Sequence, residues 1–368
     1  MKSRQFANSK NMKNNFFYSK PILLLTITCL STILLGNMPN KTGNIAGEDF
    51  TGTPTETSIV SAPEFKQKGL FFGGPTRKTP AEQLRYAEVL EKNKKYKAAT
   101  KEYNALVIEW PTAQEAPTAQ LGVARTLELR EEYLKAFKEY QYLIDNYEVR
   151  HLPEGISFID ILNSQFRIAN YYLTKLDNSF LGIGSIGVKG VTDAFAQIAR
   201  NAPEWERASE CLLRRGVAYE TVGKNIEAIM EYEDLVGRYA GTPVANEALF
   251  RAAIARYNLA LKAPRDEKTL RNAIVAMGLA ISADPYHQYV ETTIAHKKEL
   301  EEMLTALLFE KARFYDKIKP NVKAALISYR SFVKEFPVAK ETEKAKQRIS
   351  ELEEILKKEE AEKESTKQ

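Results

Sequence analysis

The carboxylates that could do acid–base chemistry lie among lysines on segments with helical periodicity. Glu301 and Glu302 follow Lys297 and Lys298 by four residues, and Glu299 lies between the two pairs. Residues four apart are neighbours on a helix surface, so each pair is expected to be a solvated ion pair. Three more carboxylates have similar surroundings, at Glu351, Glu353 and Glu354. We therefore predict no catalytic residues.

Metal-binding patterns are also missing from the sequence. The three histidines, His151, His287 and His296, are scattered without ligand spacing. The two cysteines, Cys29 and Cys211, cannot supply a disulfide framework or a cysteine-based zinc site. We therefore expect no metal.

One nucleotide-binding pattern is present, because Gly182, Gly184 and Gly187 fit G-x-G-x-x-G. That pattern needs a strand before it, and the preceding segment has helical periodicity, which favours a flexible loop. The chain has no P-loop, no GxSxG and no HExxH sequence. We expect no cofactor and no enzymatic activity.

The charge balance argues against a nucleic-acid partner. The chain carries 53 basic and 48 acidic residues, a net charge of +5. The excess is matched by five basic residues near the start, at Lys2, Arg4, Lys10, Lys13 and Lys20. The basic run KNKKYK, residues 92–97, is flanked by acidic residues. A nearly neutral remainder generates no strong field for a polyanion.

The amino terminus has the pattern of an export signal. A basic region precedes the apolar stretch Pro21–Gly36, whose core of about 15 residues is shorter than the roughly 20 of a transmembrane helix. We assign residues 1–36 to a signal peptide or an uncleaved N-terminal anchor. Lipidation at Cys29 is an alternative, but Thr26 and Thr28 fit a bacterial lipobox poorly. Cleavage by an ordinary signal peptidase within Gly36–Gly47 is preferred.

Residues 37–77 are rich in Gly, Thr, Pro, Ser and Asn and are predicted to be a flexible linker. The apolar piece Gly69–Phe72 within them is expected to dock on the following domain or under its first helix. A capping box at Thr79 and Glu82, with Pro80 at the first helical position, opens the folded part. We place a helical domain at 78–358 and a polar tail at 359–368.

A helix–turn–helix pattern then recurs along the domain. In its first copy the small residues Ala87 and Ala99 are twelve apart, and Tyr103, Leu106 and Pro111 follow Ala99 by four, seven and twelve. Small side chains let the two helices of a hairpin approach each other closely, and Tyr103 and Leu106 fill the core between them. The small residues and tyrosines assigned to repeat packing are Ala87, Ala99, Tyr103, Ala124, Ala136, Tyr140, Gly216, Ala228, Tyr232, Ala325 and Tyr329.

Other copies diverge from this template. A third hairpin is expected from helices near Ile156–Leu173, with Ala169, and Val191–Ala199, with Ala194, joined by a glycine-rich loop over 174–190. Ala273 and Ala280 mark a further copy, and residues 263–270 look like an extra loop. The last hairpin should begin with a long helix of about Val290–Asp316.

This spacing, with its aromatic residue and closing proline, resembles tetratricopeptide repeats (TPRs). The resemblance implies an all-α TPR superhelix of about five to six hairpins, whose concave surface binds protein segments. On that surface, helix-A positions facing away from the core are peptide-groove candidates: Glu88, Arg125, Glu128 and Asn170. Arg125 could hold a peptide carboxylate.

A finer resemblance is to the BamD family, periplasmic repeat lipoproteins of the outer-membrane β-barrel assembly machine. It rests on the export signal, the helix endings EYNALVIEWP and YRSFVKEFP, the inserted loop of the third hairpin and the long charged helix near the end. It implies a β-barrel assembly subunit and unfolded outer-membrane protein segments as partners, and a periplasmic location. We therefore expect a non-catalytic cell-envelope adapter. The alternative is another envelope TPR scaffold, for cell division, Tol-associated complexes or polysaccharide export.

Overall fold

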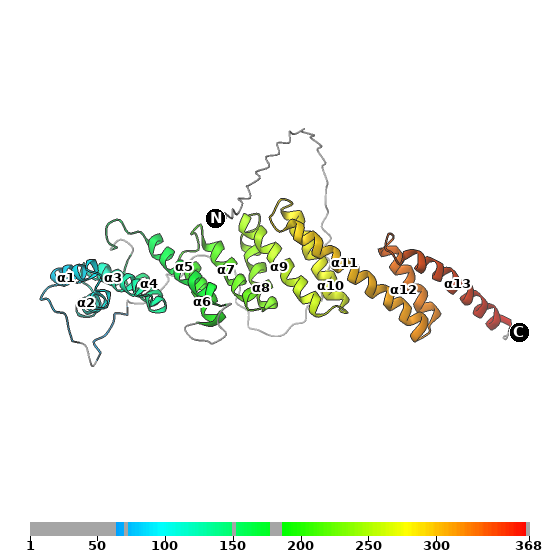
Figure 1. Cartoon of the computed structure of the whole chain (residues 1–368), viewed down its shortest axis with the longest axis horizontal. Helices are drawn as coiled ribbons and strands as arrows, with labels where there is room; N and C mark the ends of the chain where they lie inside the picture. The colour runs from blue at the N-terminus through cyan, green and yellow to red at the C-terminus, as the bar shows by residue number, and fades with distance from the viewer. Residues whose placement is uncertain (1–63, 70–72, 149–151, 177–185, 366–368) are drawn as a thin grey trace, which may run out of the picture. The chain divides into compact units, whose positions relative to one another are not determined.

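The computed structural model describes residues 64–69, 73–148, 152–176 and 186–365, and within them every regular element is a helix (Figure 1). The elements are α1 Pro80–Lys92, α2 Tyr96–Glu109, α3 Ala116–Leu129, α4 Tyr133–Asn146, α5 Phe158–Lys175, α6 Gly187–Asn201, α7 Ala208–Thr221, α8 Asn225–Arg238, α9 Pro243–Lys262, α10 Glu267–Ala283, α11 Val290–Arg313, the π-helical turn η2 Phe314–Ile318, α12 Val322–Glu335 and α13 Thr342–Ser365.

Local sequence signals explain where several helices begin. Thr79 Oγ1 accepts a hydrogen bond from the N–H of Glu82 at 3.3 Å, and Pro80 takes the first helical position. A complete capping box, with both reciprocal bonds, is formed by Ser157 and Asp160 at the start of α5. Such caps satisfy amide groups that have no partner within the helix.

The helices pack as consecutive hairpins. Each odd-numbered helix from α1 to α11 packs on the even-numbered helix that follows it, and α13 packs on α12. First helices of neighbouring hairpins also touch, for example α7 with α9 and α9 with α11. In the part of the chain that the structure describes, six hairpins followed by a helix that covers the last one form a TPR-like array, as the repeat pattern predicts. Since α13 extends to Ser365, it includes most of residues 359–368.

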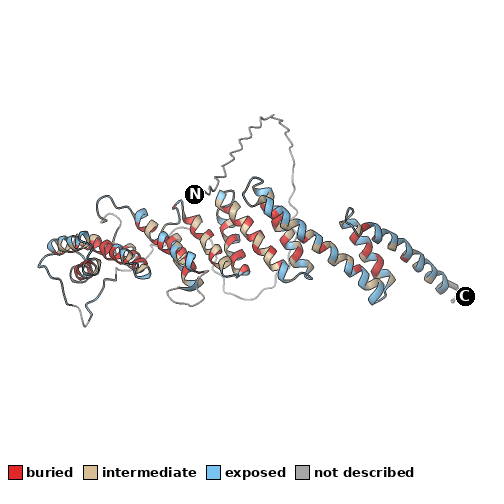
Figure 2. Ribbon diagram, viewed as in Figure 1, coloured by how far each residue is buried: buried red, intermediate tan, exposed pale blue. Residues whose placement is uncertain are grey.

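The positions assigned to repeat packing lie in the cores of the hairpins. Ala87 and Ala99 have no exposed surface, and Tyr103 is 1% exposed. All eleven side chains or glycines of that set are buried. Figure 2 shows the buried residues along the inner faces of the paired helices. The spacing of twelve therefore brings small residues of two antiparallel helices to the same level.

The third hairpin differs from the sequence-based expectation. Ala194 is only partly buried, whereas Val191, Phe195 and Ile198 are fully buried. These three, with Pro203, reproduce the template spacing of four, seven and twelve, so Val191 occupies the small-residue position. α6 begins at Gly187, so the loop predicted over 174–190 ends earlier than expected. Residues 177–185 of that loop lie outside the described part.

Two later segments also need correction. The extra loop expected at 263–270 is only a turn, because Asp266 caps α10 with a hydrogen bond to the N–H of Lys268 at 3.1 Å. The long first helix of the last hairpin, expected over about Val290–Asp316, is α-helical only to Arg313 and then continues as the π-helical turn. A π turn holds one more residue than an α turn. Ala312 and Ala325, both fully buried, are accordingly thirteen apart instead of twelve.

The predicted signal peptide, the candidate lipidation site Cys29 and most of the predicted linker lie outside the described residues. So do three of the four residues of Gly69–Phe72. Among the helices that are described, none is long and apolar enough to span a bilayer.

Replacing Ala99 by leucine is expected to lower the free energy of unfolding by about 1–3 kcal/mol, because the position has no free space. The same change at the neighbouring Ala98, which is exposed, should cost little. Urea denaturation of the two variants compares them directly. Neutralising Lys94, Lys95 or Lys97, all exposed, should also cost little. Equal stability of both leucine variants would contradict the repeat assignment of α1 and α2.

Candidate peptide-binding surfaces

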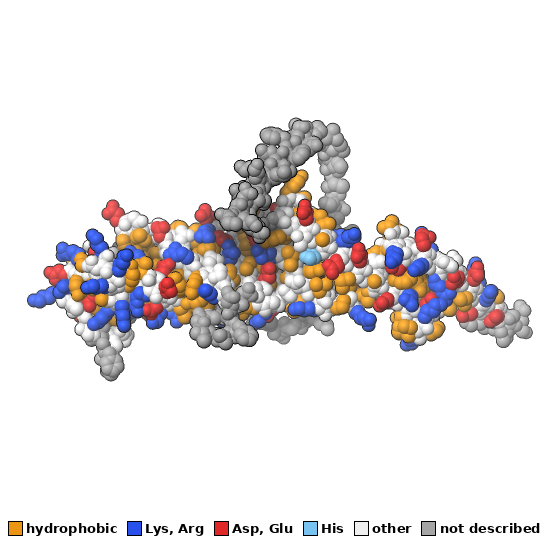
Figure 3. Space-filling model, viewed as in Figure 1, with side chains coloured by type: hydrophobic (Ala, Val, Ile, Leu, Met, Phe, Trp, Pro, Cys, Tyr) orange, Lys and Arg blue, Asp and Glu red, His pale blue; other side chains and the backbone are white. Residues whose placement is uncertain are grey.

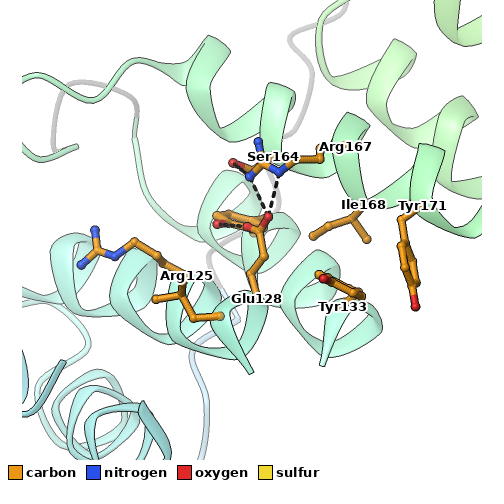
Figure 4. Close-up of a pocket in the computed structure, with 9 residues that line it drawn as sticks. Arg125, Glu128, Tyr133, Ser164, Arg167, Ile168 and Tyr171 are labelled. Atoms are coloured by element: carbon orange, nitrogen blue, oxygen red, sulfur yellow. Dashed lines mark hydrogen bonds and ion pairs between the residues drawn. The ribbon is translucent and has the colours of Figure 1, made fainter. Parts of the chain in front are cut away.

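An open pocket of about 450 Å³ lies between the second and third hairpins (Figure 4). Its lining comes from α3, α4 and α5: Arg125, Glu128, Leu129, Tyr133, Tyr140, Ser164, Arg167, Ile168 and Tyr171. Two of the four predicted groove residues, Arg125 and Glu128, are among them. The other two are elsewhere: Glu88 is exposed on α1, and Asn170 donates to the carbonyl of Phe166 at 3.0 Å.

Glu128 is bound to groups of the chain itself. Its carboxylate accepts from Tyr140 Oη at 2.8 Å and from Arg167 Nη2 at 2.6 Å, and Figure 4 shows the arginine reaching over from α5. Glu128 is 16% exposed, so most of its surface is already covered. The pocket therefore offers a free ligand the aromatic faces of Tyr133 and Tyr171 more than an unpaired carboxylate.

Arg125 is likewise paired within the array. Its Nε and Nη2 donate to the two oxygens of Glu91 at 2.6 and 2.7 Å, a bidentate arrangement. Burial disfavours the charged form of Glu91, but hydrogen bonds from Arg125 and Tyr103 outweigh it and lower its pKa. The same hydrogen bond to Glu91 raises the pKa of Arg125. A peptide carboxylate would have to compete with Glu91 for this guanidinium.

These contacts recur as an acid–tyrosine–arginine triad. In each triad an acid near the end of a hairpin's first helix accepts from a tyrosine on its second helix and from an arginine on the first helix of the next hairpin. The triads are Glu91–Tyr103–Arg125, Glu128–Tyr140–Arg167, Glu220–Tyr232–Arg251 and Asp316–Tyr329–Arg348. In the last one α13 supplies the arginine, so this helix acts as the first helix of a further repeat.

The triads connect neighbouring hairpins and are unsuited to proton transfer. Burial and the adjoining carboxylate raise the pKa of Tyr103, Tyr140 and Tyr232 far above neutrality, and that of Tyr329 to about 12. A catalytic acid or base works best with a pKa near the ambient pH. We therefore assign the triads a structural role, in which they hold neighbouring repeats in register.

A second surface already holds a polypeptide segment. The N-terminal strap, residues 64–69, has no regular secondary structure and lies against the first two hairpins. The backbone N–H of Lys66 donates to Tyr142 Oη at 2.9 Å. Its ammonium donates to Asn104 Oδ1, Gln120 Oε1 and Glu139 Oε2 at 3.0, 3.2 and 2.5 Å. All three ammonium protons thus have an acceptor.

Further contacts flank this lysine site. The ammonium lies 4.9 Å from the centroid of the Tyr142 ring, and the Phe65 ring lies 5.9 Å from that of Tyr147. The more exposed Lys68 pairs with Glu109 at 2.8 Å. Beside Phe65, an open groove of about 720 Å³ continues between the residues after α2 and those after α4. The strap therefore occupies part of a larger surface.

A repeated glutamine–glutamate pair binds segments that precede α1 in the sequence. Gln83 and Gln120 each lie four residues before a buried alanine, and each donates to both the carbonyl and the carboxylate of a glutamate 19 residues on. The first pair, Gln83–Glu102, binds Thr76, and the second, Gln120–Glu139, binds Lys66. The spacing of 19 residues repeats in the sequence, but no sequence-based expectation covered these pairs.

Other chemistry is not assembled in the described residues. No group of three or more His, Cys, Asp or Glu side chains there could hold a metal ion. Burial raises the pKa of the Cys211 thiol to about 12, so it is a structural group and no nucleophile. Figure 3 shows lysines and arginines interspersed with acidic residues over the visible face of the helices.

No protein-family model and no curated protein matches the chain. Solved structures that resemble it include TPR proteins. YrrB, "a TPR protein with an unusual peptide-binding site", is 17% identical with a TM-score of 0.29, covering 60% of this chain and 92% of that one. TTC0263 from Thermus thermophilus has the same identity and TM-score, covering 60% and 98%. A TPR protein from Parabacteroides merdae is 11% identical with a TM-score of 0.28, covering 74% and 98%. Likeness at this level says nothing about function, and the fold rests on the helix packing described above.

Proposed function

We propose that the chain is a non-catalytic adapter that binds segments of other proteins, in a BamD-like role in outer-membrane β-barrel assembly. The observation that carries the binding function is the strap itself, since the first two hairpins hold an irregular segment mainly through side chains. Segments of other chains without regular structure can be held in the same way. The triads keep neighbouring hairpins in register, so a surface that spans several repeats keeps its geometry.

The BamD-like part of the proposal is supported by sequence features. They are the predicted export signal, the helix endings and the long charged helix that begins the last hairpin. In this role the chain acts in the periplasm, attached to the outer membrane or free. Its amino-terminal hairpins receive segments of unfolded outer-membrane proteins, and its carboxy-terminal hairpins dock a barrel-bearing subunit.

Affinity purification from envelope membranes of the cells that make the protein tests this role. Cross-linking before solubilisation should recover a β-barrel assembly subunit together with the tagged chain. Removal of α12 and α13, where docking of that subunit is proposed, should abolish its recovery, provided that circular dichroism shows the remaining hairpins to be folded. Recovery of peptidoglycan-linked, Tol-associated or cell-division proteins alone would favour another envelope scaffold and reject the BamD-like role.

A further inference from the structure

We propose that the lysine site on α2, α3 and α4 recognises a partner protein's segment in which an aromatic residue is followed directly by a lysine. This segment takes the place of Phe65 and Lys66. The inference rests on the proposed adapter function, because it names the chemistry of the segment that such an adapter binds. It concerns a site made by Asn104, Gln120, Glu139, Tyr142 and Tyr147.

The site is selective for a lysine ammonium. Two amide oxygens and one carboxylate oxygen surround Lys66 Nζ, and the Tyr142 ring lies nearby. The side chains of Lys66 and Glu139 are 19% and 24% exposed, so the pair is largely shielded from water. A neutral side chain would leave Glu139 without its countercharge. The planar, five-donor guanidinium of an arginine does not match three convergent acceptors arranged for a point charge.

The aromatic position and the adjoining groove set the shape of the segment. Phe65 packs on Tyr147, and both line the open groove of about 720 Å³. Other lining residues include Thr112, Asn146 and Pro153, which offer polar and apolar contacts. No described residue fills this groove. A partner segment that continues beyond its aromatic residue would thus gain contacts that the described part of the strap does not make.

The way in which the strap is held makes it replaceable. Among the described residues, no backbone–backbone hydrogen bond joins 64–69 to the helices. Burial lowers the pKa of Lys66 despite the opposing effect of Glu139, so withdrawing this ammonium from water has a cost that offsets part of the attraction. The strap competes as an attached ligand with a high effective concentration. A partner displaces it by adding contacts in the open groove.

Among the described residues of the first three hairpins, the lysine site occurs once. In the first, the equivalent pair Gln83–Glu102 is occupied by Thr76 and by the N–H of Arg77. In the third, Gln165 is the equivalent glutamine, but Ala194 stands where the pattern puts the glutamate. A segment bound at the second hairpin is therefore placed in one register.

The test uses the full chain with Phe65→Ala and Lys66→Ala, which empties the site. The probe is a fluorescent synthetic peptide of residues 62–69, APEFKQKG. Fluorescence anisotropy should show binding to the emptied chain at least about tenfold tighter than to the unaltered chain, a difference of about 1.4 kcal/mol. Glu139→Gln in the emptied chain, or alanine in place of the peptide's first lysine, should weaken binding by a similar factor. Alanine in place of the second lysine, which corresponds to the more exposed Lys68, should change it less than about threefold.

Three outcomes would overturn the inference. The first is equal binding of the peptide to the emptied and unaltered chains. The second is equal binding to the emptied chain with and without Glu139→Gln. The third is a doubled mass of the unaltered chain in light scattering that Glu139→Gln abolishes, since the strap would then belong to a second copy. If the double variant is unfolded by circular dichroism, Lys66→Gln replaces it. A peptide failure with a successful pull-down would reject this site and leave the adapter function standing.

Discussion

Replacing Gly216 by alanine is expected to lower the free energy of unfolding by about 2 kcal/mol, although alanine normally favours a helix by about 1 kcal/mol. A Cβ at this position would lie 2.2, 2.5 and 2.8 Å from three ring carbons of Tyr232, distances that real Cβ atoms essentially never show. The ring cannot move aside easily. Tyr232 has no exposed surface, and its hydroxyl is bound to Glu220, which also pairs with Arg251.

Gly237, on α8 of the same hairpin, provides the matched control. Apart from its chain neighbours and the backbone of its own helix, no heavy atom lies within 4 Å of the Cβ that an alanine would add there. Gly237→Ala should therefore leave stability unchanged or raise it by up to about 1 kcal/mol. The midpoints of urea denaturation give the comparison. Tyr232→Leu should cost less in the Gly216→Ala background than alone, because the two changes affect one contact. Additive costs would show that the clash is absent.

Local periodicity is why the hairpins could be predicted from the sequence. Ala99, Ala136 and Ala228 each lie twelve residues after a small residue and four before a tyrosine, and both relations fall within one hairpin. The pattern was misleading where a β-branched residue took the small position, at Val191. It also failed where the π-helical turn inserted one residue, so that Ala312 was not recognised.

The triads were less predictable because their arginines belong to the next repeat. The acid precedes its tyrosine by twelve residues in three triads and by thirteen in the one that contains the π turn. The arginine follows by 22, 27, 19 and 19 residues, since the connections between hairpins differ in length. Arg125 therefore looked like a free groove residue in the sequence. The partners of Lys66, between 38 and 76 residues away, gave no local signal at all.

The last triad shows what this arrangement contributes to stability. Replacing Arg348 by methionine is expected to lower the free energy of unfolding at neutral pH by about 2–3 kcal/mol. The side chain of Asp316 is 2% exposed, and Arg348 donates to both of its carboxylate oxygens, at 2.8 and 2.9 Å. The variant leaves this carboxylate with Tyr329 Oη at 3.3 Å and Lys317 Nζ at 3.7 Å.

A second arginine, which pairs with another residue of α13, serves as the control. Arg330 on α12 pairs with Glu353 on α13 at 2.7 Å, but the two side chains are 60% and 41% exposed. Exposed pairs contribute between about 0 and 1 kcal/mol, so Arg330→Met should have a small effect. Equal costs for Arg330→Met and Arg348→Met would mean that the burial of Asp316 is irrelevant to stability.

The pH dependence of the stability difference between the unaltered chain and Arg348→Met identifies Asp316 as the cause of the loss. Burial alone would raise the pKa of Asp316, but the hydrogen bonds and charge of Arg348 outweigh it and hold the pKa below the usual 3.8. In the unaltered chain its contribution is therefore present at neutral pH and is lost only as the pH falls below about 4. In Arg348→Met the arginine no longer outweighs burial, which raises the pKa of Asp316 in the folded chain. Protonation of Asp316 then favours folding, so the variant recovers stability on acidification. The stability gap should narrow between pH 7 and pH 4, and Asp316→Asn in the same background should recover part of it at pH 7. A gap that is constant over this range would assign the loss to packing of the arginine stem.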